Sequence, residues 1–189
     1  EYLLVLNPDI HWEKKSNTLQ KMIDFMKQNP RAAIMGPKQK LEDGSIEMTV
    51  RSFPSFLIQI SRRTRLRKIP GLSTMVKKDE AEAKGLFRSK EVDWLQSSCI
   101  LVRKNFWDEV GGFDENYKIF MADVELCFQA WKRDYKVMYY PEVHVYADGK
   151  RSSSGSFRNF FNNWILRQHF KDACKYHMKH IFERFPRRI

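Results

Sequence analysis

A continuous apolar run near the start of the chain ends abruptly in polar turn residues: residues 2–6 read YLLVL, and Asn7-Pro8-Asp9 follows. Consecutive apolar side chains are typical of a strand covered on both faces, as in a parallel sheet between layers of helices. Asn, Pro and Asp favour turns, so the strand is expected to end there. The run predicts an α/β fold with Asp9 at the carboxyl edge of a sheet, where open α/β sheets bind ligands.

Helical and extended patterns alternate in the first half of the chain. Apolar residues at 19, 22, 23 and 26 have helical spacing and follow a Ser16-Asn17 capping signal. The segment AAIMGP predicts a second strand, and the Asp-Gly pair in KQKLEDGSIEMTV predicts a hairpin. Residues 51–91 predict a helix followed by a polar loop.

The second half continues this alternation. VDWLQSSCILVRK predicts one strand, NFWDEVGGFDE a short helix stopped by Gly111-Gly112, and YKVMYYPEV another strand. Between them, residues 123–133 carry an amphipathic helical stripe, and residues 156–185 are expected to be helical. The order of elements predicts an α/β class with a mixed sheet.

Composition narrows the class of protein. Hydrophobic residues make up 42% of the 189 residues and charged residues 30%, which excludes a disordered or a membrane-embedded chain. The apolar run Tyr2–Leu6 is far too short to span a bilayer. The net charge of +11 favours polyanionic partners, and a solvated basic surface is the less favoured alternative.

The cysteines and the first residue bear on the compartment and the length of the protein. Cys99, Cys127 and Cys174 form no Cys-x-x-Cys spacing, so a reducing cytoplasm is expected rather than a disulfide framework. The chain starts without Met, directly in an expected strand, which indicates a fragment of a longer protein. No Walker loop, Gly-x-Gly-x-x-Gly fingerprint or Gly-x-Ser-x-Gly elbow is present.

An acidic pair, Asp123 and Glu125, opens the amphipathic helix of this basic chain. Acidic side chains at a helix N-terminus commonly satisfy free amides and the helix dipole. A carboxylate at the rim of a sheet can also remove a proton from a hydroxyl nucleophile. The two interpretations are compatible, because a capping carboxylate can still face a cleft.

Three further residues could bind a metal ion. Asp9 could hold Mg²⁺ or Mn²⁺ together with a diphosphate, since these ions take few protein ligands and many substrate oxygens. Alternatively, Asn-Pro-Asp only shapes a turn. His144 in an expected strand is more commonly a packed or exposed residue than a ligand, and Asp148 in ADGKRSSS is equally consistent with a turn.

Five segments resemble, in order and spacing, the inverting family-two glycosyltransferases of the GT-A fold, and among them bacterial rhamnosyltransferases. They are LLVLNPDI, MGPKQKLEDGSIEMTVRSFPS, VDWLQSSCILVRKNFWDEVGGFDENY, FMADVELCFQAWKRDYKVMYYPEV and DGKRSS. The resemblance covers residues 1–154. It implies a GT-A mixed sheet flanked by helices and incomplete at its N-terminus, since the nucleoside-binding half of the family precedes the Asn-Pro-Asp strand.

The resemblance also implies roles for individual residues. Asn7 and Asp9 are expected to bind the donor diphosphate and its Mg²⁺ or Mn²⁺, and Asp123 is expected to deprotonate an acceptor hydroxyl that inverts the sugar's anomeric carbon. The donor would be a nucleotide-diphosphate sugar, with rhamnose as a family-level expectation. The acceptor, a glycan or a lipid-linked glycan of cell-surface polysaccharide synthesis, would contact Asp93, Trp94, Ser97, Asp114 and Glu115.

The chain departs from the family pattern at three positions. Ala122 replaces the usual Glu before the base, and Ser97 replaces a usual Gly. Ala147 falls on the position of a late metal-binding His, for which His144 or Asp148 would substitute. A non-catalytic relative therefore remains an alternative, and this chain alone is expected to be weakly active or inactive.

Residues 155–189 are expected to form a basic aromatic helical tail packed on the 1–154 part. Aromatic residues alternate with Arg and Lys there, which favours contact with an anionic membrane at the inner face of the plasma membrane. The aromatic residues could instead cover the domain's own core. A nucleic-acid-binding module is the less favoured alternative, because it leaves the five segments unexplained.

Overall fold

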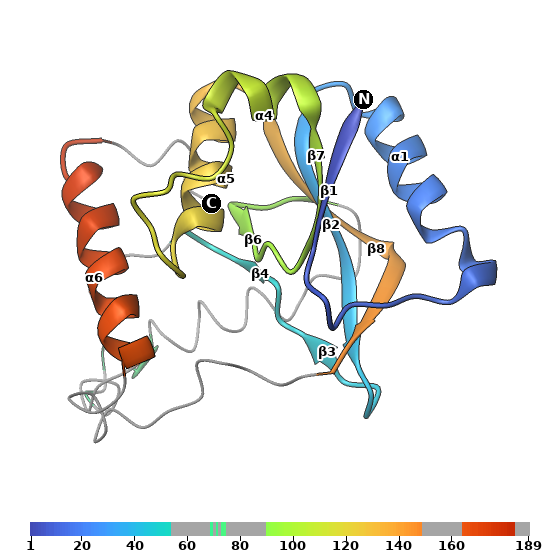
Figure 1. Cartoon of the computed structure of the whole chain (residues 1–189), viewed down its shortest axis with the longest axis horizontal. Coiled ribbons are helices and arrows are strands. Elements are labelled where there is room, and N and C mark those ends of the chain that lie inside the picture. Colours follow the sequence, from blue (N-terminus) through green and yellow to red (C-terminus); the bar gives the residue numbers. More distant parts are fainter. Residues whose placement is uncertain (54–68, 70, 72, 75–89, 149–163, 184–189) are drawn as a thin grey trace.

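A mixed sheet runs through the centre of the computed structural model, which describes residues 1–53, 69, 71, 73–74, 90–148 and 164–183 (Figure 1). The strand order is β1-β7-β2-β8-β5, with β3 paired to β2. β2 and β8 are parallel, and the other pairs are antiparallel. The strands are β1 (Tyr2–Leu6), β2 (Ala32–Leu41), β3 (Ile46–Glu47), β5 (Lys90–Glu91), β7 (Cys99–Arg103) and β8 (Lys136–Ala147). The predicted α/β class with a mixed sheet is confirmed.

β1 differs from its prediction. It is a strand, but it pairs antiparallel with β7 and is one of the two outermost described strands of this sheet, with half-buried side chains except for the exposed Leu6. The prediction of a parallel strand buried on both faces was therefore wrong for these residues. An apolar run shows that both faces are partly covered, but it carries no information on the direction of the neighbouring strand.

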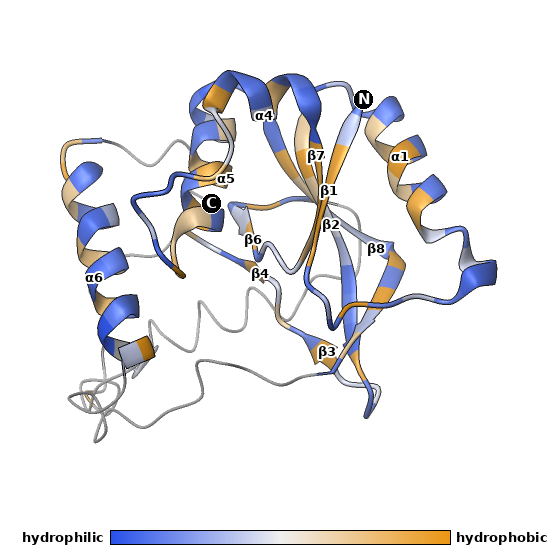
Figure 2. Cartoon of the chain, viewed as in Figure 1, coloured by the Kyte–Doolittle hydropathy of each residue, from blue (hydrophilic) through white to orange (hydrophobic). Residues whose placement is uncertain are grey.

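Helices cover the sheet on two faces (Figure 1). α1 (Thr18–Gln28) packs Met22 and Met26 on one face, and α4 (Lys104–Val110) and α5 (Ala122–Lys132) cover the other. Along β7, Cys99 and Leu101 join the cluster with α1, whereas Ile100 and Val102 join the cluster with α5. This two-residue alternation explains why β7 is apolar throughout. Figure 2 shows the hydrophobic colours gathered on the central strands.

The segment predicted as one strand from Val92 to Lys104 is two strands in different sheets. β6 (Trp94–Leu95) pairs with β4 (Val50–Arg51), and β7 lies in the central sheet. The polar residues Gln96-Ser97-Ser98 separate them, and the hydroxyl of Ser98 bonds the buried side chain of Gln39. The sequence did not indicate this break, because apolar residues stand on both sides of Gln96-Ser97-Ser98.

A bulge interrupts the parallel pair of β2 and β8. The register passes from Pro37 opposite Tyr140 to Lys38 opposite His144. Proline lacks the N–H that a ladder needs, so Pro37 and Pro141 are suited to such an irregularity. β8 continues beyond it to Ala147, four residues past the predicted end of the strand.

Several local predictions are confirmed. β3 folds back on β2 through the Asp-Gly turn, and α4 ends at Gly111 and Gly112, whose φ angles are 78° and 81°. α1 follows Asn17, but no side-chain capping bond forms there, since Asn17 itself is left-handed. The short 3-10 helix η1 (Lys14–Ser16) precedes it.

The helical tail is α6 (Trp164–Lys179), which ends earlier than predicted, in a turn at 180–183. It packs through Tyr176 against Tyr117, Met121 and Val124. The predicted helix and loop at 51–91 lie largely outside the described residues. So do the start of the predicted tail and the proposed boundary at residue 154.

Candidate active site

Asp123 lies in the first turn of α5, opposite the turn that joins β6 to β7. The helix begins at Ala122 after Met121, whose φ is 73°, so Asp123 is the second helical residue rather than the N-cap. Its carboxylate accepts hydrogen bonds from the N–H of Val124 at 2.9 Å and from the N–H of Ser97 at 3.4 Å. The side chain is therefore held at the β6–β7 turn while the residue stays partly exposed.

The protonation of Asp123 is poised near neutral pH. Burial raises its pKa to about 6, while the N–H groups of Val124 and Ser97 and the positive charge of Arg51 act in the opposite direction. A carboxylate with this pKa is a better proton acceptor than an ordinary Asp and is still ionised at pH 7. The geometry and the pKa of Asp123 thus fit a general base.

The Asn-Pro-Asp turn contacts the same β6–β7 turn. The N–H of Asn7 donates to the carbonyl of Ser98 at 2.8 Å, and the N–H of Ile10 closes the turn on the carbonyl of Asn7. Asp123 binds the adjacent residue, Ser97, so both predicted segments meet at one edge of the sheet. The sequence placed Asp9 and Asp123 separately at the edge of the sheet, and their roles stay predictions.

Asp9 has oxygens available for a ligand. It is partly exposed, and none of the residues that the structure describes donates a hydrogen bond to its carboxylate. A hard carboxylate of this kind fits Mg²⁺ or Mn²⁺, which also bind substrate oxygens. Within residues 1–53, 90–148 and 164–183, however, no group of three or more His, Cys, Asp or Glu side chains is close enough to hold a metal ion.

His144, a predicted ligand, belongs to an aromatic group on β8. Its Nε2 lies 3.4 Å from the hydroxyl of Tyr146, whose ring also stacks on His11 at 5.5 Å between centroids. Burial lowers the pKa of His144, and the charges of Lys40 and Lys38 lower it further. The imidazole is therefore neutral at pH 7, as a ligand must be. Asp148 is half-buried at the end of a described segment, so the metal-binding roles of both residues stay predictions.

Asp93 and Trp94, two predicted acceptor contacts, hold the strand pair β4–β6 in place. The carboxylate of Asp93 accepts the N–H of Phe53 at 2.9 Å, and the indole N–H of Trp94 donates to the carbonyl of Ser52 at 2.9 Å. Both side chains therefore shape the segment next to Arg51. Their contact with an acceptor stays a prediction.

The other predicted acceptor contacts lie in the loop before α5. Asp114 accepts hydrogen bonds from the backbone and side chain of Asn116 and from Lys179 of α6. Glu115 is exposed. The loop therefore presents one carboxylate tied to α6 and one directed to solvent.

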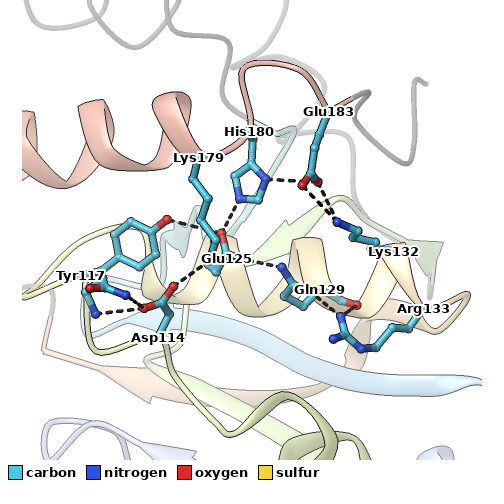
Figure 3. Close-up of polar contacts among 10 residues, drawn as sticks. Asp114, Tyr117, Glu125, Gln129, Lys132, Arg133, Lys179, His180 and Glu183 are labelled. Carbon is cyan, nitrogen blue, oxygen red and sulfur yellow. Dashed lines mark hydrogen bonds and ion pairs between the residues drawn. The ribbon is translucent and has the colours of Figure 1, made fainter.

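Glu125 is the centre of a buried polar network that the sequence did not reveal (Figure 3). Only 2% of the residue is exposed, and its carboxylate accepts hydrogen bonds from Lys179 and Gln129 at 2.8 Å and lies 2.6 Å from Nε2 of His180. Burial opposes its ionisation, but the hydrogen bonds from Lys179, His180 and Gln129 outweigh it, so the pKa of Glu125 is lowered. The acidic residue expected to serve the helix dipole thus joins α5 to α6.

A second buried carboxylate, Asp172 of α6, holds the loop before α5. It is fully buried and accepts the N–H groups of Ile119 at 3.2 Å and Phe120 at 3.0 Å, while Gln168 donates to its other oxygen at 2.7 Å. The loop leads directly into the left-handed Met121 and the helix that carries Asp123. The inner face of α6 therefore positions the start of α5.

Comparisons with known proteins point to one class of enzyme, the glycosyltransferases. The chain is 30% identical over 152 residues to N-acetylglucosaminyl-diphospho-decaprenol L-rhamnosyltransferase from two strains of Mycobacterium tuberculosis, a match that covers 77% of this chain and 46% of that protein. It is 26% identical over 180 residues to rhamnosyltransferase WbbL of Escherichia coli K12, covering 93% of this chain and 61% of that protein. The chain thus spans about half the length of these relatives.

The homologues of this chain are rhamnosyltransferases, and the rhamnosyltransferase-like resemblance predicted from the sequence is confirmed. No family model matches the chain. A crystal structure of GalNAc-T7 with UDP, GalNAc and Mn²⁺ has a TM-score of 0.48 and 11% identity, and the match covers 98% of this chain and 41% of that one.

None of the helices in the described part of the chain combines the length and the apolar character needed to cross a membrane.

Proposed function

We propose that the chain is the metal-binding and acceptor-binding part of a GT-A glycosyltransferase. It would transfer a sugar, with rhamnose as the first candidate, from a nucleotide-diphosphate donor to a lipid-linked glycan. The rhamnosyltransferase homologues support the reaction class, and the name of one of them contains N-acetylglucosaminyl-diphospho-decaprenol, a lipid-linked sugar. The observation that carries the proposal is that Asp123 and the Asn-Pro-Asp turn contact adjacent residues of the β6–β7 turn.

Asp123 is the proposed base. Its carboxylate removes the proton of an acceptor hydroxyl, whose oxygen attacks the anomeric carbon as the bond to the donor diphosphate breaks, so configuration inverts. Hydrogen bonds from Val124 and Ser97 fix the direction of the carboxylate, and burial keeps its proton affinity high.

Asp9 is the proposed protein ligand of a divalent metal ion, with His144 and Asp148 as further candidates. When bound, such an ion would neutralise charge on the leaving diphosphate. Asn7 orients the turn that carries Asp9 through its backbone bond to Ser98. Asp93, Trp94, Ser97, Asp114 and Glu115 are proposed to line the acceptor side.

A calorimetric titration tests the donor site. The chain is titrated with Mn²⁺ and then with uridine or thymidine diphosphate, and Asp9→Ala is compared with Asp43→Ala. Asp43 is a suitable control because its exposed carboxylate accepts hydrogen bonds from the side chain and the N–H of Ser45 within a local turn. Diphosphate binding that needs Mn²⁺ and is lost only in the Asp9 variant supports the proposal, whereas equal binding in both variants contradicts the role of Asp9.

A transfer assay tests the base. Thymidine-diphosphate rhamnose and a polyprenyl-diphosphate N-acetylglucosamine serve as donor and acceptor, with the chain in its full-length protein. Removal of a general base typically costs 10²–10⁴-fold in rate. Transfer by Asp123→Asn at the wild-type rate would exclude Asp123 as the base and favour the alternative of a non-catalytic relative.

A further inference from the structure

The two sides of α6 differ completely in chemistry. Its inner side is buried and made of residues that bind the loop before α5 and α5 itself, namely Gln168, Asp172, Ala173, Tyr176 and His180. The side chains on its outer side and in the turn that follows are exposed. They are Trp164, Arg167, Phe170, Lys171, Lys175, Met178, Ile181 and Phe182, and we call these eight residues the outer face.

The outer face combines large apolar side chains with cations. Met178 is 66% exposed, Ile181 68% and Phe182 98%, although exposing such side chains to water is unfavourable. Arg167 and Lys171 lie among them, four residues apart, and Lys175 lies at the edge of the face, where it donates to the carbonyl of Asn116 at 2.9 Å. Large apolar groups gathered on one exposed face mark an interaction surface rather than the random exposure of single residues.

Acidic groups are absent from this face. The single acid of α6, Asp172, is buried on the inner side, and Glu183, after the helix, is paired with Lys132. Lys179 is turned inward to Asp114 and Glu125. The described outer face is therefore purely cationic and apolar, so its complement is an anionic surface with an apolar interior.

We propose that the outer face of α6 docks on the surface of an anionic lipid bilayer. The helix would lie in the plane of the interface, with Trp164, Met178 and Phe182 in the headgroup and acyl boundary and with Arg167 and Lys171 among anionic headgroups. Long Arg and Lys side chains reach headgroups while their stems stay in apolar surroundings. Docking this face leaves the buried inner contacts of α6 intact, because Asp172, Tyr176 and His180 lie on the inner side.

The proposal does not depend on the proposed function, and vesicle binding tests it. The chain is sedimented with vesicles of phosphatidylcholine alone or with 30% phosphatidylglycerol. Binding is expected to need the anionic lipid and to fall with salt, because exposed charges are screened. In Arg167→Glu/Lys171→Glu, binding should fall at least about 25-fold, since each lost cation costs roughly fivefold. Phe182→Ser/Met178→Ser should also weaken it.

The matched controls lie on the opposite side of the protein, around η1 and α1 (Figure 1). Lys14→Glu/Lys15→Glu makes the same change in net charge at exposed positions, and Leu19→Ser removes an apolar side chain that is 37% exposed. These variants are expected to bind like the wild type. Circular dichroism of each variant shows whether α6 remains folded.

Three results would overturn the proposal. The first is equal binding to vesicles with and without anionic lipid, or equal weakening by the charge reversals on α6 and on η1. The second is self-association in sedimentation velocity that Phe182→Ser abolishes without vesicles, which would assign the face to a second copy of the chain. The third is tighter binding of an oligonucleotide than of vesicles to the same face.

Discussion

Replacement of Glu125 should loosen α6 from the rest of the chain, because this carboxylate joins it to α5. In Glu125→Ala, His180 loses its 2.6 Å partner while its side chain is only 2% exposed, which costs about 1–3 kcal/mol. Lys179 is 44% exposed and keeps Asp114, so its loss is below about 1 kcal/mol. With the bond from Gln129, the free energy of unfolding should fall by about 3 kcal/mol.

Glu125→Gln removes the negative charge of the side chain but keeps its size, so it measures the contribution of the charge alone. The folded-state pKa of Glu125 is lowered, so the stability that its ionised form contributes is complete above the unfolded pKa of about 4.3 and is lost as pH falls through the folded value. The wild type should therefore exceed Glu125→Gln by about 1–2 kcal/mol at pH 7 and by less at pH 4.

Urea unfolding followed by Trp fluorescence measures both effects. With a slope of about 2 kcal/mol/M, the midpoint of Glu125→Ala should lie about 1.5 M below the wild type. Asp108→Asn is the control, since it removes a carboxylate from an exposed pair with Lys104 and should cost less than about 1 kcal/mol. A Glu125→Ala midpoint as close to the wild type as that of the control would refute the argument that the network holds α6.

Three further changes test individual contacts. Burial raises the pKa of the half-exposed Asp123 to about 6, so the wild type loses stability as pH rises from 4 to 7 and this carboxyl group ionises. Asp123→Asn should therefore gain about 1–2 kcal/mol in unfolding free energy relative to the wild type over this range, as chemical denaturation would measure. A wild-type advantage that grows with pH would contradict this. Asp172→Ala should speed hydrogen exchange of the two loop amides that it binds, whereas Asp172→Asn should preserve much of their protection; equal exchange in both variants would contradict the role of the carboxylate. Gly112→Ala should cost about 1–3 kcal/mol, since its φ is 81° and a Cβ would lie 3.0 Å from Trp107; Gly111→Ala, with similar φ but open space, should cost less.

The sequence predicted the elements whose cause is local. The helical stripe from Val124 to Trp131, the Asp-Gly hairpin and the glycine stop after α4 each depend on neighbouring residues, and all three are present. The direction of β1 depends on which strand lies beside it, a contact with residues about 100 positions away. The apolar pattern does not encode that choice.

The candidate site shows the same division. Asp9 and Asp123 were expected at the carboxyl edge, and the shared turn Ser97-Ser98 brings their segments together. Glu125 was interpreted as a helix-dipole residue because its partners, Lys179 and His180, come from a helix more than 50 positions away. Two cues could have indicated the network: the absence of any acid on the outer face of α6, and the pairing of Lys179-His180 with an acid at the start of another apolar helix.

The two acidic side chains in the first turn of α5, Asp123 and Glu125, point to opposite sides of the helix. Residues two apart on a helix do not face each other, so Asp123 reaches the β6–β7 turn while Glu125 reaches α6. The first turn of α5 is thus fixed between the sheet edge and the inner face of α6, and Asp172 fixes the loop before it. Loosening α6 from within should therefore disturb the proposed base, whereas charge reversal on the outer face should leave it unchanged. A titration of Asp123 by carboxyl NMR distinguishes the two: its pKa should move in Glu125→Ala and Asp172→Ala and stay near 6 in Arg167→Glu/Lys171→Glu.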